Sequence, residues 1–96
     1  MNHIVFSWDE SEARQNLQRH GVSFDEASTS FLDENARLIH DPEHSQHEDR
    51  FILLGLSARL RLLLVCHTCR KEEREIQIIS ARTATRSEQK QYGSYL

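Results

Sequence analysis

The sequence predicts an α+β fold in which two N-terminal helices and a C-terminal helix pack on a central antiparallel sheet. Apolar runs rich in β-branched residues predict strands. Capping-box pairs mark the starts of the helices. The last three predicted strands are joined by short connections, which favours an antiparallel meander. The predicted order is β-α-α-β-β-β-β-α, in a single domain that spans residues 1–96.

Composition is that of a globular domain. Hydrophobic residues make up 38% of the chain and charged residues 28%, which excludes the disordered class. No apolar run has the length that crosses a membrane. The first residues contain neither a basic segment nor a cleavage site of a signal peptide, so we expect a cytoplasmic location.

The two parts of the chain differ in charge. Residues 1–58 contain four basic and eleven acidic residues, a net charge of −7, whereas residues 59–96 contain eight and four, a net charge of +4. This split favours an anionic partner for the second part, such as nucleic acid or an acidic protein. The alternative is that the two parts neutralise each other across the fold. The overall net charge of −3 argues against a protein that coats nucleic acid without specificity.

The N-terminal segment predicts a strand followed by a helix. The strand covers residues 4–8. Asp9 is the predicted N-cap, and Glu12 completes a capping box three residues later. The helix should end near His20, because Gly21 is a favourable residue for the position after a helix.

A second helix should start at Ser23, which forms a capping box with Glu26. It should end near Leu32. An apolar stripe at helical spacing predicts that one face is part of the core and not a platform for bases: Phe24, Ala27 and Phe31.

Four strands should follow, over residues 37–40, 50–56, 61–67 and 76–81. Polar residues from Thr68 to Glu75 predict a turn between the last two strands. The two middle strands are nearly continuous apolar runs, which is typical of strands covered on both faces. We expect the N-terminal helices on one face and the C-terminal helix or a partner protein on the other.

The stretch from Ile76 to Glu88 should join a buried strand directly to the last helix. Thr85 and Glu88 form a third capping box. Arg82 falls at the junction, where a guanidinium on a rigid strand end is placed to meet an anion. The alternative is that Arg82 pairs with a nearby carboxylate or the C-terminus of a helix.

Histidine and cysteine residues make a zinc-binding structural domain an alternative: His40, His44, His47, Cys66 and Cys69. Against zinc, Cys66 and Cys69 would point to opposite faces of a regular strand. No second pair occurs at zinc-finger spacing. We therefore expect reduced thiols, no metal and no cofactor.

The chain resembles the BrnT toxins, ribonuclease-type toxins of bacterial type II toxin–antitoxin systems. The resemblance covers nearly the whole sequence and depends on many short motifs in order: Phe6-x-Trp8-Asp9, residues 20–27, Asp41-Pro42-x-His44-Ser45, Glu48-x-Arg50-Phe51, Gly55-Leu56-Ser57, Arg61, Val65, residues 78–85 and Tyr92. Two positions depart from the family pattern. Leu60 stands where the family usually has glycine, and Gln77 where it often has arginine.

The resemblance implies a RelE-like fold and RNA cleavage that arrests translation and growth. It also implies neutralisation by a BrnA-type antitoxin, whose ribbon-helix-helix part binds the operon's own DNA, in a complex with two copies of each protein. DNA binding would then belong to the antitoxin. The alternative is a catalytically weak or inactive binding module that acts with its antitoxin in operon autoregulation.

A metal-independent ribonuclease needs a base for the 2′-OH, cations for the phosphate and an acid for the leaving oxygen. We assign Arg61 and Arg82 to the phosphate. Glu48 or His44 is the candidate base, and Tyr92 orients the substrate or acts as the acid. Three further arginines are expected to bind RNA: Arg50, Arg59 and Arg86. The alternative for each arginine is a structural ion pair with one of the many carboxylates.

Overall fold

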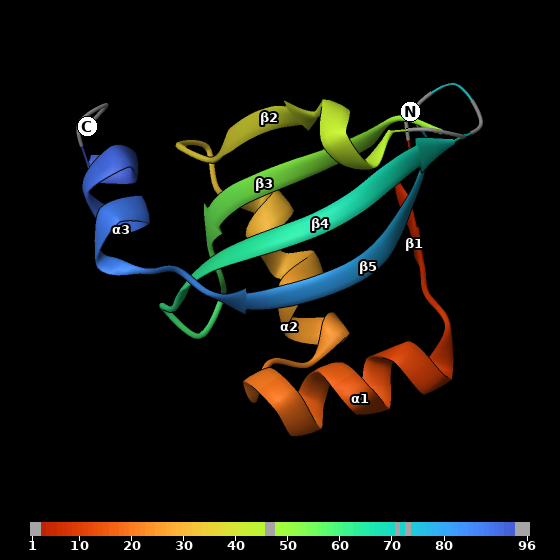
Figure 1. Ribbon diagram of the computed structural model, residues 1–96, viewed down its shortest axis with the longest axis horizontal. Coiled ribbons are helices and arrows are strands. Elements are labelled where there is room, and N and C mark those ends of the chain that lie inside the picture. Colours follow the sequence, from red (N-terminus) through yellow and green to blue (C-terminus); the bar gives the residue numbers. More distant parts are fainter. Residues whose placement is uncertain (1–2, 46–47, 71, 73, 94–96) are drawn as a thin grey trace.

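A five-stranded sheet lies at the centre of the protein (Figure 1). The computed structural model describes residues 3–45, 48–70, 72 and 74–93. Along the chain the elements are β1 (Val5–Ser7), α1 (Glu10–His20), α2 (Phe24–Thr29), β2 (Arg37–Asp41), β3 (Arg50–Leu56), β4 (Leu62–Arg70), β5 (Glu75–Thr83) and α3 (Arg86–Gly93), with short 3₁₀ turns η1 (Ser30–Leu32) and η2 (Pro42–His44). The predicted α+β class is confirmed.

The sheet is mixed, with the strand order β1-β5-β4-β3-β2. Strands β2 to β5 pair antiparallel, so the predicted meander is confirmed. The prediction of a purely antiparallel sheet is wrong, because β1 pairs parallel with β5, placing Val5 opposite Glu75. The long path between β1 and β5, through both N-terminal helices and three strands, lets the chain return in the same direction.

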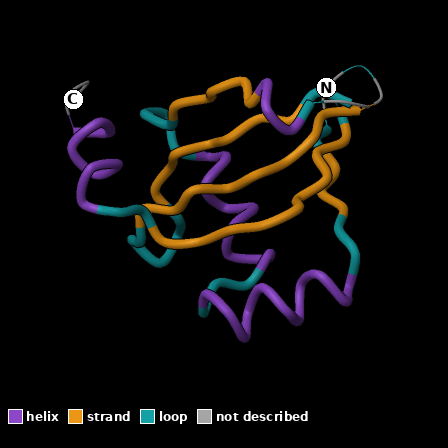
Figure 2. Tube along the Cα trace, in the orientation of Figure 1, coloured by secondary structure: helices purple, strands orange, loops and turns teal. Residues whose placement is uncertain are grey.

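Helices α1 and α2 cover one face of the sheet, where both pack on β5 (Figures 1 and 2). The core lies between these helices and the sheet. Its buried members are Val22, Phe24, Ala27, Leu53, Leu63, Val65, Ile76, Ile78 and Ala81. The alternation of side chains along a strand explains why these strand residues share one face.

The residues that alternate with the core residues point to the other face, which no helix covers along its length and which we call the open face, although Leu54 and Thr68 on it are buried: Arg50, Ile52, Leu54, Leu64, Cys66, Thr68, Gln77 and Arg82. The C-terminal helix, which was predicted to pack on the sheet, contacts it at β3. Helix α3 has no buried residue and stands beside the end of the sheet (Figure 1). Its sequence contains only one large apolar side chain, Tyr92, so it has no apolar stripe to bury.

The predicted helix starts are confirmed. Asp9 Oδ1 accepts the N–H of Glu12 at 2.9 Å. Gly21 ends α1 with φ of 69°, in the left-handed region that glycine adopts without strain. Asn16 is buried within α1 and links it to β5, because its amide exchanges hydrogen bonds of 2.8 and 3.0 Å with the backbone of Ala81.

Strands β4 and β5 extend beyond the predicted limits. A turn was expected over Thr68 to Glu75, but both of these residues lie in strands. Thr68 is fully buried and pairs with Gln77, and Arg70 pairs with Glu75. Polar side chains therefore continue the ladder, because backbone pairing does not depend on apolar side chains.

The turn between β3 and β4 contains a strained residue. Leu60 has φ of 63°, a conformation that favours glycine, which explains why a family pattern would place glycine at this position. Nearby, Gly55 lies so close to η1 that a Cβ atom would meet the carbonyl oxygen of Ser30 at 2.8 Å. Both positions depend on backbone geometry.

Cys66 and Cys69 are free thiols on opposite faces of β4, since Cys69 packs against the core and Cys66 pairs with Ser80. In the part of the chain that the structure describes, no three residues of metal-ligating type lie together. Over the same part, no helix combines the length and the apolar character of a membrane span.

Candidate functional site

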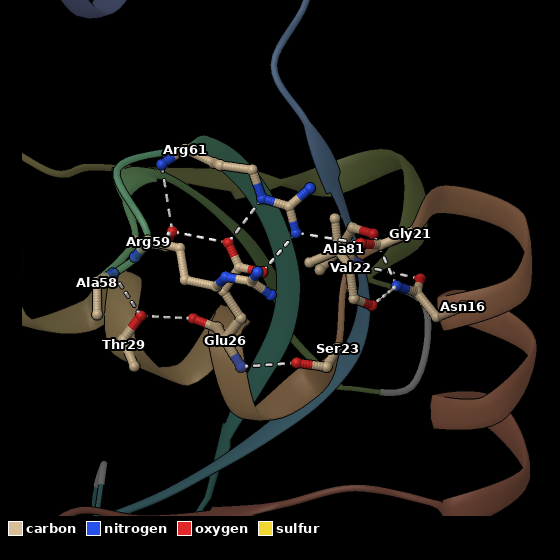
Figure 3. A network of polar contacts seen from close by, with 11 residues as sticks. Asn16, Gly21, Val22, Ser23, Glu26, Thr29, Ala58, Arg59, Arg61 and Ala81 are labelled. Carbon is tan, nitrogen blue, oxygen red and sulfur yellow. Dashed lines mark hydrogen bonds and ion pairs between the residues drawn. The ribbon is translucent and has the colours of Figure 1, made fainter.

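Arg61 belongs to a partly buried polar network between α2 and the β3–β4 turn (Figure 3). Its Nε donates to Glu26 Oε2 at 2.9 Å, its Nη2 donates to Glu26 Oε1, and Nη2 also reaches the carbonyl oxygen of Gly21 at 3.1 Å. Only 4% of the Glu26 side chain is exposed. The hydrogen bond from Arg61 is the main reason why the pKa of Glu26 lies below its ordinary value.

Helix α2 places Glu26 in this network through its N-terminal cap. Ser23 Oγ accepts the N–H of Glu26 at 3.0 Å, which is the N-cap half of the predicted capping box. The carboxylate of Glu26 then accepts a hydrogen bond from Ser57 Oγ at 2.8 Å, in addition to those from Arg61. The guanidinium of Arg61 is therefore bound to a carboxylate and a carbonyl of its own chain. This arrangement is the structural ion pair that was the alternative to a role in phosphate binding.

Arg82 forms a second ion pair, with Glu88 in the first turn of α3. Its Nη1 and Nη2 donate to the two carboxylate oxygens of Glu88 at 2.8 and 2.9 Å. Glu88 also accepts the N–H of Thr85 at 2.8 Å, and Thr85 Oγ1 accepts the N–H of Glu88 at 3.2 Å, so the predicted capping box is complete. These contacts, led by the bond from Arg82, lower the pKa of Glu88 to about 2.

Tyr92 is hydrogen-bonded to Asp33 from the last turn of α3. Its hydroxyl donates to Asp33 Oδ2 at 2.6 Å, and the same oxygen accepts the N–H of Leu56 at 2.8 Å. The hydrogen bond to the carboxylate raises the pKa of Tyr92 to about 12. A shallow depression beside the ring is lined by Leu56, Leu60, Leu62, Gln89 and Tyr92.

Arg61 and Arg82 do not meet, contrary to the predicted shared phosphate site. Arg82 is paired with Leu64 and therefore projects from the open face. Arg61 contacts Glu26 and Gly21 on the face that α1 and α2 cover. Each guanidinium is bound to its own carboxylate, and the two lie on opposite faces.

Glu48, a candidate base, lies at the far end of the sheet. Its carboxylate accepts hydrogen bonds of 3.0 to 3.2 Å from Arg70, the last residue of β4. Arg61 directly precedes the nine residues of β4, so Arg70 lies roughly 30 Å from Arg61 along the strand at a rise of about 3.3 Å per residue. Glu48 therefore cannot serve one reacting group together with Arg61. The side chain of His44, the other candidate base, lies outside the described part of the structure.

A serine, a histidine and an aspartate lie close together near Glu48. His40 Nε2 is 3.3 Å from Asp49 Oδ1 and 3.5 Å from Ser45 Oγ. A nucleophilic triad needs both ring nitrogens, one toward the serine and the other toward the carboxylate. Because both contacts here use Nε2, this group is not a Ser-His-Asp triad.

The three predicted RNA-binding arginines occupy different regions. Arg50 begins β3 on the open face. Arg59 lies in the β3–β4 turn on the side of Glu26 (Figure 3). Arg86 is exposed at the start of α3. Arg50 and Arg82 thus share a face, and the open face carries a guanidinium near each of its ends.

Sequence reasoning missed Asp33 and Ser57 and gave Glu26 a capping role alone. Asp33 follows the predicted end of the second helix, a place where an aspartate is common for local reasons. Its bonds to Tyr92 and Leu56 join segments 59 and 23 residues apart. No local pattern signals such contacts, so a single sequence offers no way to find them.

Comparison with known proteins identifies relatives of the chain. The model of the family described as "Ribonuclease toxin, BrnT, of type II toxin-antitoxin system" matches residues 8–88. Among solved structures, the crystal structure of the Brucella abortus ribonuclease toxin BrnT is similar, with a TM-score of 0.66 and 19% sequence identity over 86% of this chain and 99% of that chain. No curated protein matches.

Proposed function

The chain belongs to the BrnT family of ribonuclease toxins of type II toxin–antitoxin systems, and from this premise we propose that it cleaves RNA and so arrests translation and growth. The observation that carries the proposal is the family match over residues 8–88, which includes the N-caps of all three helices and every strand from β2 to β5. Cleavage would take place in the cytoplasm, where the RNA is.

We place the RNA on the open face. Arg82 and Arg50 project from this face near opposite ends, and a guanidinium suits phosphate oxygens. The Arg82 side chain is 37% exposed, so the guanidinium can contact a ligand while Glu88 orients it. Arg61 has no place in this site, because it lies on the other face and satisfies Glu26.

The chemistry would be metal-independent attack by the 2′-OH on the adjacent phosphate, with a 2′,3′-cyclic phosphate and a 5′-hydroxyl as products. Arg82 would stabilise the charge that develops on the phosphate. Tyr92 holds its proton firmly, since its pKa is raised to about 12, which fits an acid or an orienting group better than a base. Glu88 is a poor base, because its pKa is lowered to about 2.

Growth of a bacterium that expresses the chain tests the proposal. We expect growth arrest with the wild-type protein and normal growth with Arg82→Ala. Arg82→Lys should be only partly toxic, because it keeps the charge but loses the two-pronged donor geometry of the guanidinium. Arg14→Ala is the matched control, since Arg14 is exposed on α1. In the purified protein, cleavage of RNA in the presence of EDTA should continue. If EDTA stops cleavage, the metal-independent mechanism is wrong.

The partner that this function requires is an antitoxin. We propose a BrnA-type ribbon-helix-helix protein, with two copies of each chain in the complex and DNA bound only through the antitoxin. The RelE-like character of the fold remains part of this proposal. Co-expression with the neighbouring open reading frame should restore growth and yield a stable complex on purification.

A second candidate function is a binding module without catalysis. The observation that favours it is the neutralisation of both Arg61 and Arg82 by carboxylates, which leaves neither guanidinium unpaired. Such a chain would cause no growth arrest and cleave no RNA, yet it would still bind its antitoxin and change repression of the operon. These results together would replace the enzymatic proposal.

A further inference from the structure

Strand β2 forms one edge of the sheet. It pairs with β3 only, and none of the described elements lies beyond it (Figure 1). The pairing with β3 is regular over five residues, from Arg37 opposite Leu54 to Asp41 opposite Arg50. Half of the backbone N–H and C=O groups of such a strand point away from the sheet and can pair with another strand.

This edge exposes apolar side chains and lacks several of the features that protect sheet edges. Leu38 is 59% exposed and Ile39 43% exposed, and they lie on opposite faces of the strand. Edge strands of soluble proteins are commonly protected by lysine, proline or a β-bulge. Residues 37–41 contain no lysine and no proline, and their register with β3 has no bulge. The edge is therefore suited to accept a strand.

The sequence of β2 is complementary to itself. If two copies of β2 pair antiparallel about a twofold axis at Ile39, Arg37 of each copy lies opposite Asp41 of the other, and Leu38 lies opposite His40. Opposite charges directly across an antiparallel pair are stabilising, and like charges are destabilising. We propose that β2 pairs with β2 of a second copy of this chain, so that one sheet continues through a symmetric dimer.

Existing contacts of the two charged residues are compatible with this pairing. Arg37 Nη1 donates to the carbonyl oxygen of Gln91 at 3.2 Å. A guanidinium carries five N–H donors, and a carboxylate has about four acceptor positions, so each can serve a neighbour within the chain and one across the axis. A strand of five residues buries little area, so the dimer should be weak and its population should depend on concentration.

Sedimentation velocity and native mass spectrometry of the purified chain test the proposal. The wild-type protein should show a reversible monomer–dimer equilibrium. Arg37→Asp alone and Asp41→Arg alone should each weaken the dimer about tenfold or more, because each places like charges opposite one another twice. An equimolar mixture of these two variants should form a heterodimer, since every facing pair is then of opposite charge.

The mixture separates this proposal from a loss of folding, because variants that fail to fold do not rescue each other. Ile39→Lys should abolish dimers in every combination, and Leu32→Lys is the control, as Leu32 is 83% exposed outside β2. A wild-type chain that stays monomeric at about 100 μM overturns the proposal. So does a mixture without heterodimers. Loss of antitoxin binding by Ile39→Lys in a monomeric chain would assign the edge to the antitoxin instead. None of these results depends on RNA cleavage.

Discussion

Arg61 stabilises a buried carboxylate, and this sets the consequence of its removal. Arg61→Ala leaves Glu26 with a side chain that is 4% exposed and without its charged partner. We expect a loss of about 2–3 kcal/mol in the free energy of unfolding, in the range for breaking a buried or half-buried ion pair. Urea unfolding followed by Trp8 fluorescence measures it.

Arg59→Ala is the matched control for this prediction. Arg59 lies in the same turn and is exposed, and we expect a change within about 0.5 kcal/mol. If Arg61→Ala unfolds at the same urea concentration as the wild type and yet loses RNA cleavage, Arg61 acts in catalysis and not in folding.

Glu88 should make the free energy of unfolding depend on pH in the acid range. Its pKa is about 2 in the folded chain and about 4.5 when unfolded, so the unfolded chain binds the proton first as the pH falls. The contribution of the carboxylate is complete above about pH 4.5 and disappears toward pH 2. The difference in stability between the wild type and Glu88→Gln should therefore be largest near neutral pH and shrink across this window in urea titrations.

If the stability difference between the wild type and Glu88→Gln stays constant from pH 6 to pH 2.5, the ion pair between Glu88 and Arg82 does not form in solution. Gln18→Ala, a substitution at an exposed site on α1, gives the baseline for acid effects unrelated to Glu88.

Local residue patterns predicted caps but not their distant partners. The three cap residues Asp9, Ser23 and Thr85 were found because each cap bond spans three residues. The carboxylate of Glu26 instead turns to Arg61, 35 residues later. Contacts at such separation depend on the register of the sheet, which no window of sequence contains.

At the scale of elements, α3 depends on few contacts. It contains no buried residue, and an isolated helix of eight residues is unstable in water. Tyr92 bonds to Asp33, which lies between η1 and β2. Tyr92→Phe should therefore loosen α3 alone. The loss of about 1 kcal/mol from one hydrogen bond corresponds to about fivefold faster amide hydrogen exchange in α3.

Lys90→Ala serves as the control for this prediction, because Lys90 is exposed on the same helix. It should leave exchange in α3 nearly unchanged. Faster exchange of α1 in Tyr92→Phe would contradict the prediction, since α1 packs on β5 and the bond of Tyr92 is to Asp33, outside α1.

The elements themselves were predictable where apolar side chains define them. Strand β3 has the predicted bounds, Arg50–Leu56, because an unbroken apolar run marks it. The ends of β4 and β5 were missed, since Thr68, Arg70 and Glu75 are polar and yet paired. Helix α3 was identified from its cap, but a cap gives no information on what the helix packs against.

At the scale of the whole molecule, the predicted phosphate site does not form, because the two arginine side chains point to opposite faces of the sheet. Sequence reasoning assigned Arg61 and Arg82 to one phosphate without fixing their places in the sheet, and the pairing of β4 with β5 does put them near the same end. Successive strand residues alternate between faces, so a shift of one residue moves a side chain to the other face. The sequence does not determine that parity across two strands, and the two arginines lie on opposite faces.

The whole core should respond to pH through His67, which has 1% exposure and lies between Phe31 and Phe51. Burial lowers the pKa of His67 below its ordinary value of 6.5, so the ring is neutral in the folded chain. The unfolded chain binds a proton there first, and stability should therefore fall as the pH decreases below about 6.5. His67→Leu should flatten this decline between pH 7 and pH 5 in urea titrations.

Phe51→Leu, which disturbs the same cluster without removing a titratable group, should lower stability equally at both ends of that range. A decline that persists in His67→Leu would mean that another group is responsible.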